Sequence, residues 1–269
     1  MVVTGLNDVR ARSNKFCSDR NWSQFHTPNN ILLALAGEVG ELCEIFQWKG
    51  DLDAFVLKDQ TVFSSEEISH IGEEISDVII YSTRLCDVVN IDLANIVHAK
   101  AAGKNLSSPR PLGFSWSTDF PFSNLEKYTE SIVQQKSRSP RYYANKLTVY
   151  MGKLTSLFVR PEVESTSGLK AWSHEDIRDL SSIMGSIIIT MSCLATSVGL
   201  ELPKILSSKM DANERKYPVS KAFGSAAKYT KYQKKSEIGG VSVLSTVLVS
   251  ASCLVAGVVA GAFAANKRW

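Results

Sequence analysis

Two groups of acidic residues in this sequence have a spacing that could bind a divalent cation. Glu38, Glu41 and Glu44 recur at every third position of an otherwise apolar segment, so on a helix their carboxylates project from roughly one side. Glu74 and Asp77 repeat this spacing in a second apolar segment. Like charges one turn apart repel each other unless a cation neutralises them, and carboxylate oxygens are the ligands that Mg²⁺ prefers. The alternative is a pair of ordinary amphipathic helices with acidic flanks.

The segments that carry these carboxylates are expected to be helices of an all-α domain. Their apolar residues recur at intervals of three and four, and no alternating pattern typical of strands competes. The spacing predicts four helices in the first half of the chain, at residues 6–20, 28–48, 65–89 and 92–104. Thr27 followed by Pro28 is typical of a helix start. With 269 residues, 44% of them hydrophobic, the chain can bury a substantial core.

The overall composition narrows the class of protein. The net charge is +3 and the isoelectric point is about 8.5, which is too mild to indicate nucleic-acid binding, so no nucleic-acid partner is expected. The five cysteines show no metal-ligand spacing and are typical of reduced packing residues in a reducing compartment. Residues 1–12 contain no apolar segment of the kind found in secretory signals.

The second half of the chain repeats the first. Residues 40–46 align with residues 152–158, and residues 90–97 align with residues 199–206. The sequence therefore predicts two tandem units of four helices each. In the second unit other residues replace the four carboxylates: Tyr150 for Glu38, Lys153 for Glu41, Ile183 for Glu74 and Ser186 for Asp77. The second unit is expected to bind no metal at that position.

The second unit ends in a dense set of polar residues at helical spacing. The hydrogen-bond donors among them suit phosphate oxygens and a nucleoside, and the set consists of Lys209, Asp211, Asn213, Arg215 and Tyr217. The matching stretch of the first unit, residues 98–105, keeps Lys100 but lacks the aligned Asn, Arg and Tyr. Because the two losses are complementary, one pocket shared by both units is the favoured interpretation. Independent drift of a duplicated gene is the alternative.

Four strings of the sequence resemble a known enzyme family. They are residues 21–26 (NWSQFH), 33–49 (LALAGEVGELCEIFQWK), 73–81 (EEISDVIIY) and 208–218 (SKMDANERKYP). They resemble the MazG-like superfamily of all-α nucleoside triphosphate pyrophosphohydrolases, and its dCTP pyrophosphatase branch most closely. The fourth string occurs only in the second unit, so this chain departs from the family pattern there.

The resemblance implies a Mg²⁺-dependent reaction, with Mn²⁺ as a possible substitute, that cleaves between the α- and β-phosphates of a nucleoside triphosphate. It implies a metal site made by Glu38, Glu41, Glu74 and Asp77. Glu41 or its neighbour Glu44 could accept a proton from the attacking water. The implied substrate-binding residues are Trp22, His26, Trp48, Lys209, Asp211, Asn213, Arg215 and Tyr217. Core packing is the alternative role for His26 and Trp48, and a solvated helix end is the alternative for Arg215.

The resemblance also implies an assembly. Family members usually join two or more identical subunits and build their pockets at the interface, so the tandem units are expected to form a covalent pseudo-dimer. A further homo-oligomer stays possible. The predicted boundaries are a first unit at residues 1–106, a linker at 107–122, a degenerate second unit at 123–218 and a basic linker at 219–237.

Residues 238–265 are expected to form a C-terminal transmembrane helix. They carry no charge and exceed the roughly 20 apolar residues that cross a bilayer as a helix. Only four residues follow, so insertion would come after translation and leave the catalytic part in the cytosol. A buried helix of a soluble protein is the alternative. Both flanks are basic, so the positive-inside rule favours neither orientation, and no particular organelle is predicted.

The sequence as a whole therefore predicts a membrane-anchored hydrolase of nucleoside triphosphates. Its substrate would be dCTP or a related (modified) pyrimidine deoxynucleotide, and its products the monophosphate and pyrophosphate. Two alternatives remain at this point. One is a non-catalytic nucleotide sensor or scaffold that has kept the fold. The other is the same chemistry on dUTP, because the pocket contacts that separate two bases amount to only a few kcal/mol.

Overall fold

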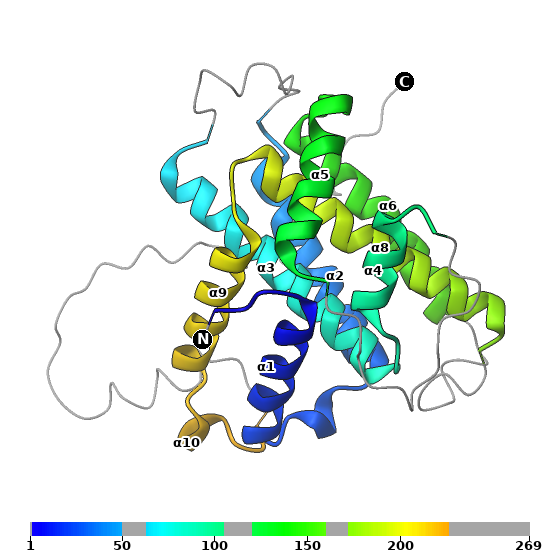
Figure 1. Ribbon diagram of the computed structural model, residues 1–269. Helices are drawn as coiled ribbons and strands as arrows, with labels where there is room; N and C mark the ends of the chain where they lie inside the picture. The colour runs from blue at the N-terminus through cyan, green and yellow to red at the C-terminus, as the bar shows by residue number, and fades with distance from the viewer. Residues whose placement is uncertain (1, 50–62, 105–119, 160–171, 226–269) are drawn as a thin grey trace, which may run out of the picture. The chain divides into compact units, whose positions relative to one another are not determined.

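The computed structural model describes residues 2–49, 63–104, 120–159 and 172–225 of the chain (Figure 1). The chain divides into two units, residues 1–227 and residues 228–269, and all described residues lie in the first. The main helices are α1 (Leu6–Asp19), α2 (Pro28–Phe46), α3 (Ser65–Val88), α4 (Leu93–Ala101), α5 (Phe122–Lys136), α6 (Pro140–Phe158), α8 (His174–Ser197) and α9 (Leu202–Lys216). The short helices are η1 (Ser23–Phe25) and α10 (Val219–Ala222). No strand occurs among the described residues, so the all-α expectation is confirmed for this part of the chain.

The helices of the two halves begin in the same way. Both α2 and α6 are 19 residues long and start with a proline, and the hydroxyls of Thr27 and Ser139 accept hydrogen bonds from the backbone three residues later. Both α3 and α8 are 24 residues long and start with a capping box, at Ser64 and Ser173 respectively. Equal lengths with equal caps mean that the same local signals define the helices in each half.

The turns that follow the long helices also match. Asn90 after α3 and Gly199 after α8 both have left-handed backbone conformations, with φ of 72° and 73°. This region is open to glycine and is visited by asparagine more readily than by most other residues. In both halves the chain then reverses and starts the next helix three residues later, at Leu93 and Leu202.

The helices pack reciprocally between the halves. α2 packs on α3 and α6 packs on α8, while α2 also contacts α6 and α3 also contacts α8. The last helix of each half crosses to the other half, because α9 lies against α3 and α4 lies against α8. A single hydrophobic core runs through both halves, with Leu35, Ile75, Leu147 and Ile187 all fully buried. The two halves therefore do not have separate cores.

The crossing of α4 over α8 depends on a glycine. A Cβ atom at Gly185 would lie 2.6 Å from both the Ile96 Cγ2 and the Lys100 Cδ atoms. Such an approach is too close for a real Cβ, so only glycine lets α4 come this near. The stem of Lys100 is thereby held against α8.

The helix α8 is the only one among the described residues with the length and apolar composition of a membrane span. It is 72% buried over its apolar window and contributes Leu180, Met184 and Met191 to the core. The same composition is expected of the central helix of a helical domain, so α8 is weak evidence of membrane insertion. The predicted transmembrane segment at residues 238–265 lies outside the described residues.

Several predicted boundaries differ from the structure. The helix predicted at 28–48 ends at Phe46, and the one predicted at 92–104 ends at Ala101. Phe122, assigned to a linker, is the first residue of α5 and is buried. The basic linker predicted from residue 219 begins instead with α10, because Ala222 packs into the protein and anchors this segment. Helix ends depend on such tertiary contacts as well as on local sequence.

Candidate metal and nucleotide site

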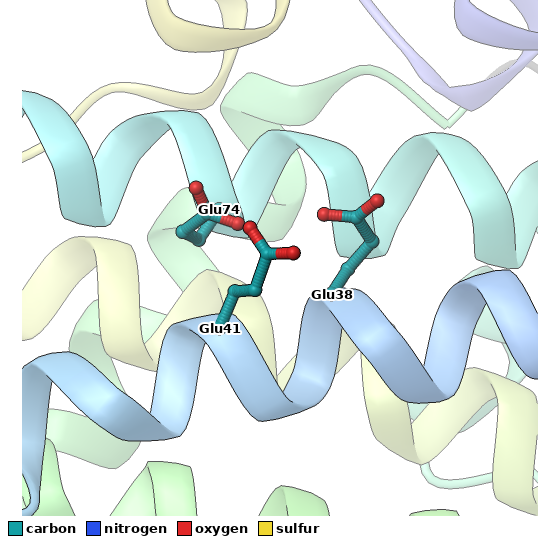
Figure 2. Close-up of side chains that lie close together, drawn as sticks. All are labelled: Glu38, Glu41 and Glu74. Carbon is teal, nitrogen blue, oxygen red and sulfur yellow. The ribbon is translucent and has the colours of Figure 1, made fainter. Parts of the chain in front are cut away.

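Three of the four predicted metal ligands converge between two helices. Glu38 and Glu41 project from α2, and Glu74 projects from α3 towards them (Figure 2). One carboxylate oxygen from each residue lies within 4.8 Å of the others. The apolar spacing of both helices produces this geometry, because Leu35, Leu42 and Ile75 lie in the core and turn the neighbouring carboxylates towards the opposite helix.

The electrostatics of this cluster favour a bound cation. Burial, and then repulsion from Asp77, Glu41 and Glu74, raises the pKa of Glu38 to about 8. Burial also raises the pKa of Glu74. The Glu74 Oε1 atom lies 3.2 Å from His70 Nε2, whereas its Oε2 atom is buried without a hydrogen-bond partner among the described residues. A buried carboxylate oxygen without a partner is costly, so this geometry fits a hard cation at the cluster.

The fourth predicted ligand, Asp77, is paired with a lysine from the other half. Lys209 of α9 places its ammonium 2.5 Å from Asp77 Oδ2 and 3.7 Å from Glu73 Oε2. The side chains of Lys209 and Asp77 are only 12% and 14% exposed, so solvent screens this ion pair weakly. The crossing of α9 onto α3 thus brings a cation of the second half to the carboxylates of the first.

A pocket opens beside the carboxylates, and its walls come from α1, α3, α9 and the segment around η1. Glu38 and Asp77 line it at one end. Phe16, Trp22 and Tyr217 form an aromatic group in its wall, with Trp22 5.5 Å from Phe16 and 5.2 Å from Tyr217 between ring centroids, both edge to face. Such rings offer flat apolar surface to a planar ligand.

His26 contributes a fixed hydrogen-bonding group to this pocket. Its Nδ1 atom accepts a hydrogen bond of 2.9 Å from Arg84 Nε. Burial, and then the charge of Arg84, lowers the pKa of His26 to about 4, so its ring is neutral near pH 7. Because a guanidinium can only donate, Nδ1 is the acceptor and the ring proton lies on Nε2. Arg84 in turn donates to Asn14 and Asp87, at 2.5 and 2.8 Å, which holds it in place.

The segment after α9 is hydrogen-bonded to the end of α1 and to Trp22 of the pocket wall. The Trp22 Nε1 group donates to the Ala222 carbonyl at 3.0 Å, and Arg20 Nε donates to the Tyr217 carbonyl at 2.7 Å. The Gly224 amide donates to the Arg20 carbonyl at 2.8 Å. These bonds attach α10 to the end of α1 and hold the aromatic group together.

Comparison with known proteins adds independent information. The chain is 42% identical over 95 residues to dCTP pyrophosphatase 1 of Rattus norvegicus and of Bos taurus, and 43% identical over 95 residues to that of Homo sapiens. Each match covers 35% of this chain and 54% of the relative, so the chain spans about half the length of the curated relatives it matches. No family model matches the chain. No solved structure matches it either.

The chain is related to the dCTP pyrophosphatases over these 95 residues. This relationship agrees with the resemblance that the sequence motifs carry.

The structure gathers most of the residues that the dCTP pyrophosphatase resemblance singled out. Around the carboxylates and the pocket lie Glu38, Glu41, Glu74, Asp77, Trp22, His26, Lys209, Asn213 and Tyr217. They come from opposite ends of the described chain, and the crossing of α9 onto α3 brings them together.

Four predicted residues lie elsewhere. Trp48 is 88% exposed and lies beyond the last residue of α2, Phe46. Glu44 is exposed and stands outside the carboxylate group. Arg215 is exposed and does not line the pocket, since its neighbours on α9 occupy the inward face. Asp211 forms an ion pair with Arg12 of α1 and so fastens α9.

Sequence reasoning missed several residues of the pocket. Tyr81 and Arg84 line it from α3, at four and seven residues beyond Asp77, so they continue the polar stripe of that helix. That spacing could have revealed them. Ser13 and Phe16 line it from α1. The Ser13 hydroxyl is buried without a hydrogen-bond partner among the described residues, which leaves it available to a ligand.

Proposed function

We propose that this protein is a Mg²⁺-dependent nucleoside triphosphate pyrophosphohydrolase that acts on dCTP or a related pyrimidine deoxynucleotide. The observation that carries the proposal is the group of Glu38, Glu41 and Glu74 beside a pocket of aromatic side chains. The relationship to proteins named dCTP pyrophosphatase 1 supports the reaction class and the base.

The residues present fit a magnesium ion. All the donors are carboxylate oxygens, and Glu74 Oε2 is buried without a partner among the described residues. Glu38, Glu41, Glu74 and Asp77 would hold the ion. When bound, Mg²⁺ supplies charge neutralisation on the phosphate oxygens and a lower pKa for the attacking water. Mn²⁺ has similar oxygen chemistry and is an expected substitute.

The chain's own side chains would orient the nucleotide. The neutral ring of His26 presents its Nε2 proton to an acceptor on the pyrimidine edge, and Arg84 fixes the tautomer. Phe16, Trp22 and Tyr217 would shield the base from water. The Lys209 ammonium, beside Asp77, can donate to phosphate oxygens as well as to the carboxylate. Glu41 remains the candidate that accepts a proton from water, because Glu44 lies outside the carboxylate group.

We further propose that the two halves are tandem copies and that they share this one site. The matched lengths and caps of α2 with α6 and of α3 with α8 support a duplication. The reciprocal crossing of α9 onto α3 and of α4 onto α8 supports a pseudo-dimer. In this proposal the first copy supplies the carboxylates, and the second supplies Lys209, Asn213 and Tyr217.

A matched pair of variants on α2 tests the proposed reaction. The full chain, purified in detergent, is incubated with Mg²⁺ and a panel of nucleoside triphosphates, and pyrophosphate is assayed against free phosphate. We expect pyrophosphate from dCTP, and a loss of at least about 100-fold in kcat/KM for Glu41→Gln, because a member of the carboxylate group is removed. Glu44→Gln is the control, one turn further along the same helix, and should keep most of the activity.

Two results would contradict the proposal. Equal losses for Glu41→Gln and Glu44→Gln would mean that the carboxylate group described here is not the reacting one. No turnover of any nucleotide by folded protein would favour a nucleotide sensor or scaffold. Turnover of dUTP in preference to dCTP would keep the chemistry and change the base.

We also propose that residues 238–265 anchor the protein in a membrane. Their length and uncharged composition support this. Detergent phase separation tests it: the full chain should enter the detergent phase, and the double variant Leu254→Lys/Val258→Lys should not, because two charges at mid-segment oppose insertion.

A further inference from the structure

The second half has a groove at the position that corresponds to the carboxylate site of the first half. A groove between α6 and α8 is lined by Tyr150, Lys153, Ser156, Leu157, Asp179, Ser182, Ile183 and Ser186. The sequence alignment pairs four of these residues with Glu38, Glu41, Glu74 and Asp77 of the first half. Under the proposed duplication, both halves have an open space at this position, lined by different side chains.

The negative charge of the carboxylate site is missing at the second position. In the first half three glutamate side chains lie close together. In the second half Lys153 occupies the position aligned with Glu41, and uncharged residues occupy the positions of the other three ligands. Asp179 is the one acidic residue that lines the groove. Lys153 has no carboxylate within 4.0 Å among the described residues, so Asp179 does not neutralise it by a direct ion pair.

A second lysine, from the other half, contacts a residue that lines this groove. Lys100 of α4 donates to the Ser182 hydroxyl at 3.2 Å, just as Lys209 of α9 reaches Asp77 in the first half. Its stem is pinned against Gly185, so its position is fixed by the close crossing of α4 and α8. Burial lowers the pKa of Lys100, and no acidic partner among the described residues offsets that effect.

The groove therefore offers donors to an anion. Two ammonium groups and the Ser182 hydroxyl, whose own proton is not used by Lys100, can donate hydrogen bonds. The Ser156 and Ser186 hydroxyls already donate to backbone carbonyls, at 2.8 and 2.7 Å, and can only accept. Clustered lysines with hydroxyls bind phosphate oxygens through charge-assisted hydrogen bonds.

We infer that the groove between α6 and α8 is a metal-independent binding site for a phosphate oxyanion, held by Lys153, Lys100 and Ser182. The ligand is a pyrophosphate or triphosphate group, which can come from inorganic pyrophosphate or from the tail of a nucleoside triphosphate. This site is separate from the carboxylate site and rests on the proposed duplication only for its pairing with that site. The lysine ammonium groups would supply the positive charge that a metal ion would supply in the first half.

Binding measured in the absence of metal reports on this groove and not on the carboxylate site, because the carboxylates of the first half repel an anion when no cation is present. Calorimetry on the full chain, in detergent with EDTA, is expected to show saturable binding of inorganic pyrophosphate. Lys153→Ala and Lys100→Ala should each weaken it about tenfold or more, since each removes a charge-assisted hydrogen bond. Lys153→Arg should largely retain it. A second arm uses an α,β-methylene analogue of dCTP: competition with pyrophosphate identifies the nucleotide tail as a ligand, and its absence identifies inorganic pyrophosphate.

The controls separate this site from the first. Lys127→Ala removes an exposed lysine of α5 outside the groove and should leave binding unchanged. Thermal unfolding of each variant verifies that it is folded. No saturable binding in EDTA would overturn the inference. Binding that survives both groove variants but is lost in Lys209→Ala would also overturn it. Because hydrolysis is measured separately with Mg²⁺, a failure of the proposed enzyme activity does not affect this result.

Discussion

At the scale of single residues, the environment of His26 makes the stability of the folded protein depend on pH. Its pKa is lowered from 6.5 to about 4, first by burial and then by Arg84. Between these two values the unfolded chain binds a proton that the folded protein excludes. Stability contributed by the neutral ring is therefore complete above pH 6.5 and is lost as the pH falls towards 4.

Replacing this histidine should reduce the acid sensitivity of the fold. We expect His26→Asn to lose less stability than the unchanged protein between pH 6.5 and 4, by about 1–2 kcal/mol after allowance for solvent screening at this partly exposed ring. Chemical denaturation at several pH values measures the difference. His174→Asn, at the exposed start of α8, is the control and should follow the unchanged protein. Parallel pH profiles for the unchanged protein and His26→Asn would contradict this account of the pocket.

At the scale of elements, the distance between α4 and α8 rests on one glycine. A Cβ at Gly185 would lie 2.6 Å from side-chain atoms of Ile96 and Lys100. We expect Gly185→Ala to destabilise the protein by about 1–3 kcal/mol, because α4 must move outward and this overpacking exceeds the helical gain of alanine. Denaturant unfolding measures the change.

A second helical glycine provides the matched control. Gly152 lies inside α6, and a Cβ there would meet no atom within 4 Å. Gly152→Ala should stabilise the protein by about 0.5–1 kcal/mol, since alanine restricts the unfolded chain and favours the helix. If both alanine variants were stabilising, the result would contradict the close approach of α4 to α8 described here.

At the scale of the whole molecule, the two halves place equivalent lysines at unlike sites. Lys209 pairs with Asp77 beside the carboxylates, and Lys100 bonds Ser182 in the groove of the second half. We expect Lys209→Ala to lower kcat/KM for dCTP by about tenfold or more, because one charged contact to the shared site is removed. Lys100→Ala should leave hydrolysis within about twofold of the unchanged protein.

The variants Lys209→Ala and Lys100→Ala together test whether both halves of the chain contribute to the carboxylate site. Similar losses in both variants would indicate a general effect on the fold, and thermal unfolding would then reveal it. Full activity in Lys209→Ala would mean that the first half works without α9. A further homo-oligomer, expected from the family resemblance, stays a prediction.

The sequence predicted many of the residues that the structure brings together around the carboxylates. The three-residue spacing of Glu38, Glu41, Glu74 and Asp77 within apolar helices fixes which face each carboxylate takes, because the helical period is a local property. Trp48 and Arg215, which the resemblance also assigned to the site, do not line the pocket. Trp48 lies beyond the last turn of α2, and Arg215 lies on the outward face of α9, so the position of each depends on where a helix ends and which side it packs.

The sequence by itself determined the helices and their caps, because these follow from contacts between residues close in the chain. The duplicated order, with the carboxylates lost in the second half, stays a prediction. Only the tertiary structure decided which helix lies against which. The crossing of α9 onto α3, and of α4 onto α8, pairs residues more than 80 positions apart, such as Lys209 with Asp77 and Lys100 with Ser182. The apolar faces of the helices alone do not specify that choice, because it depends on how both halves fill one common core.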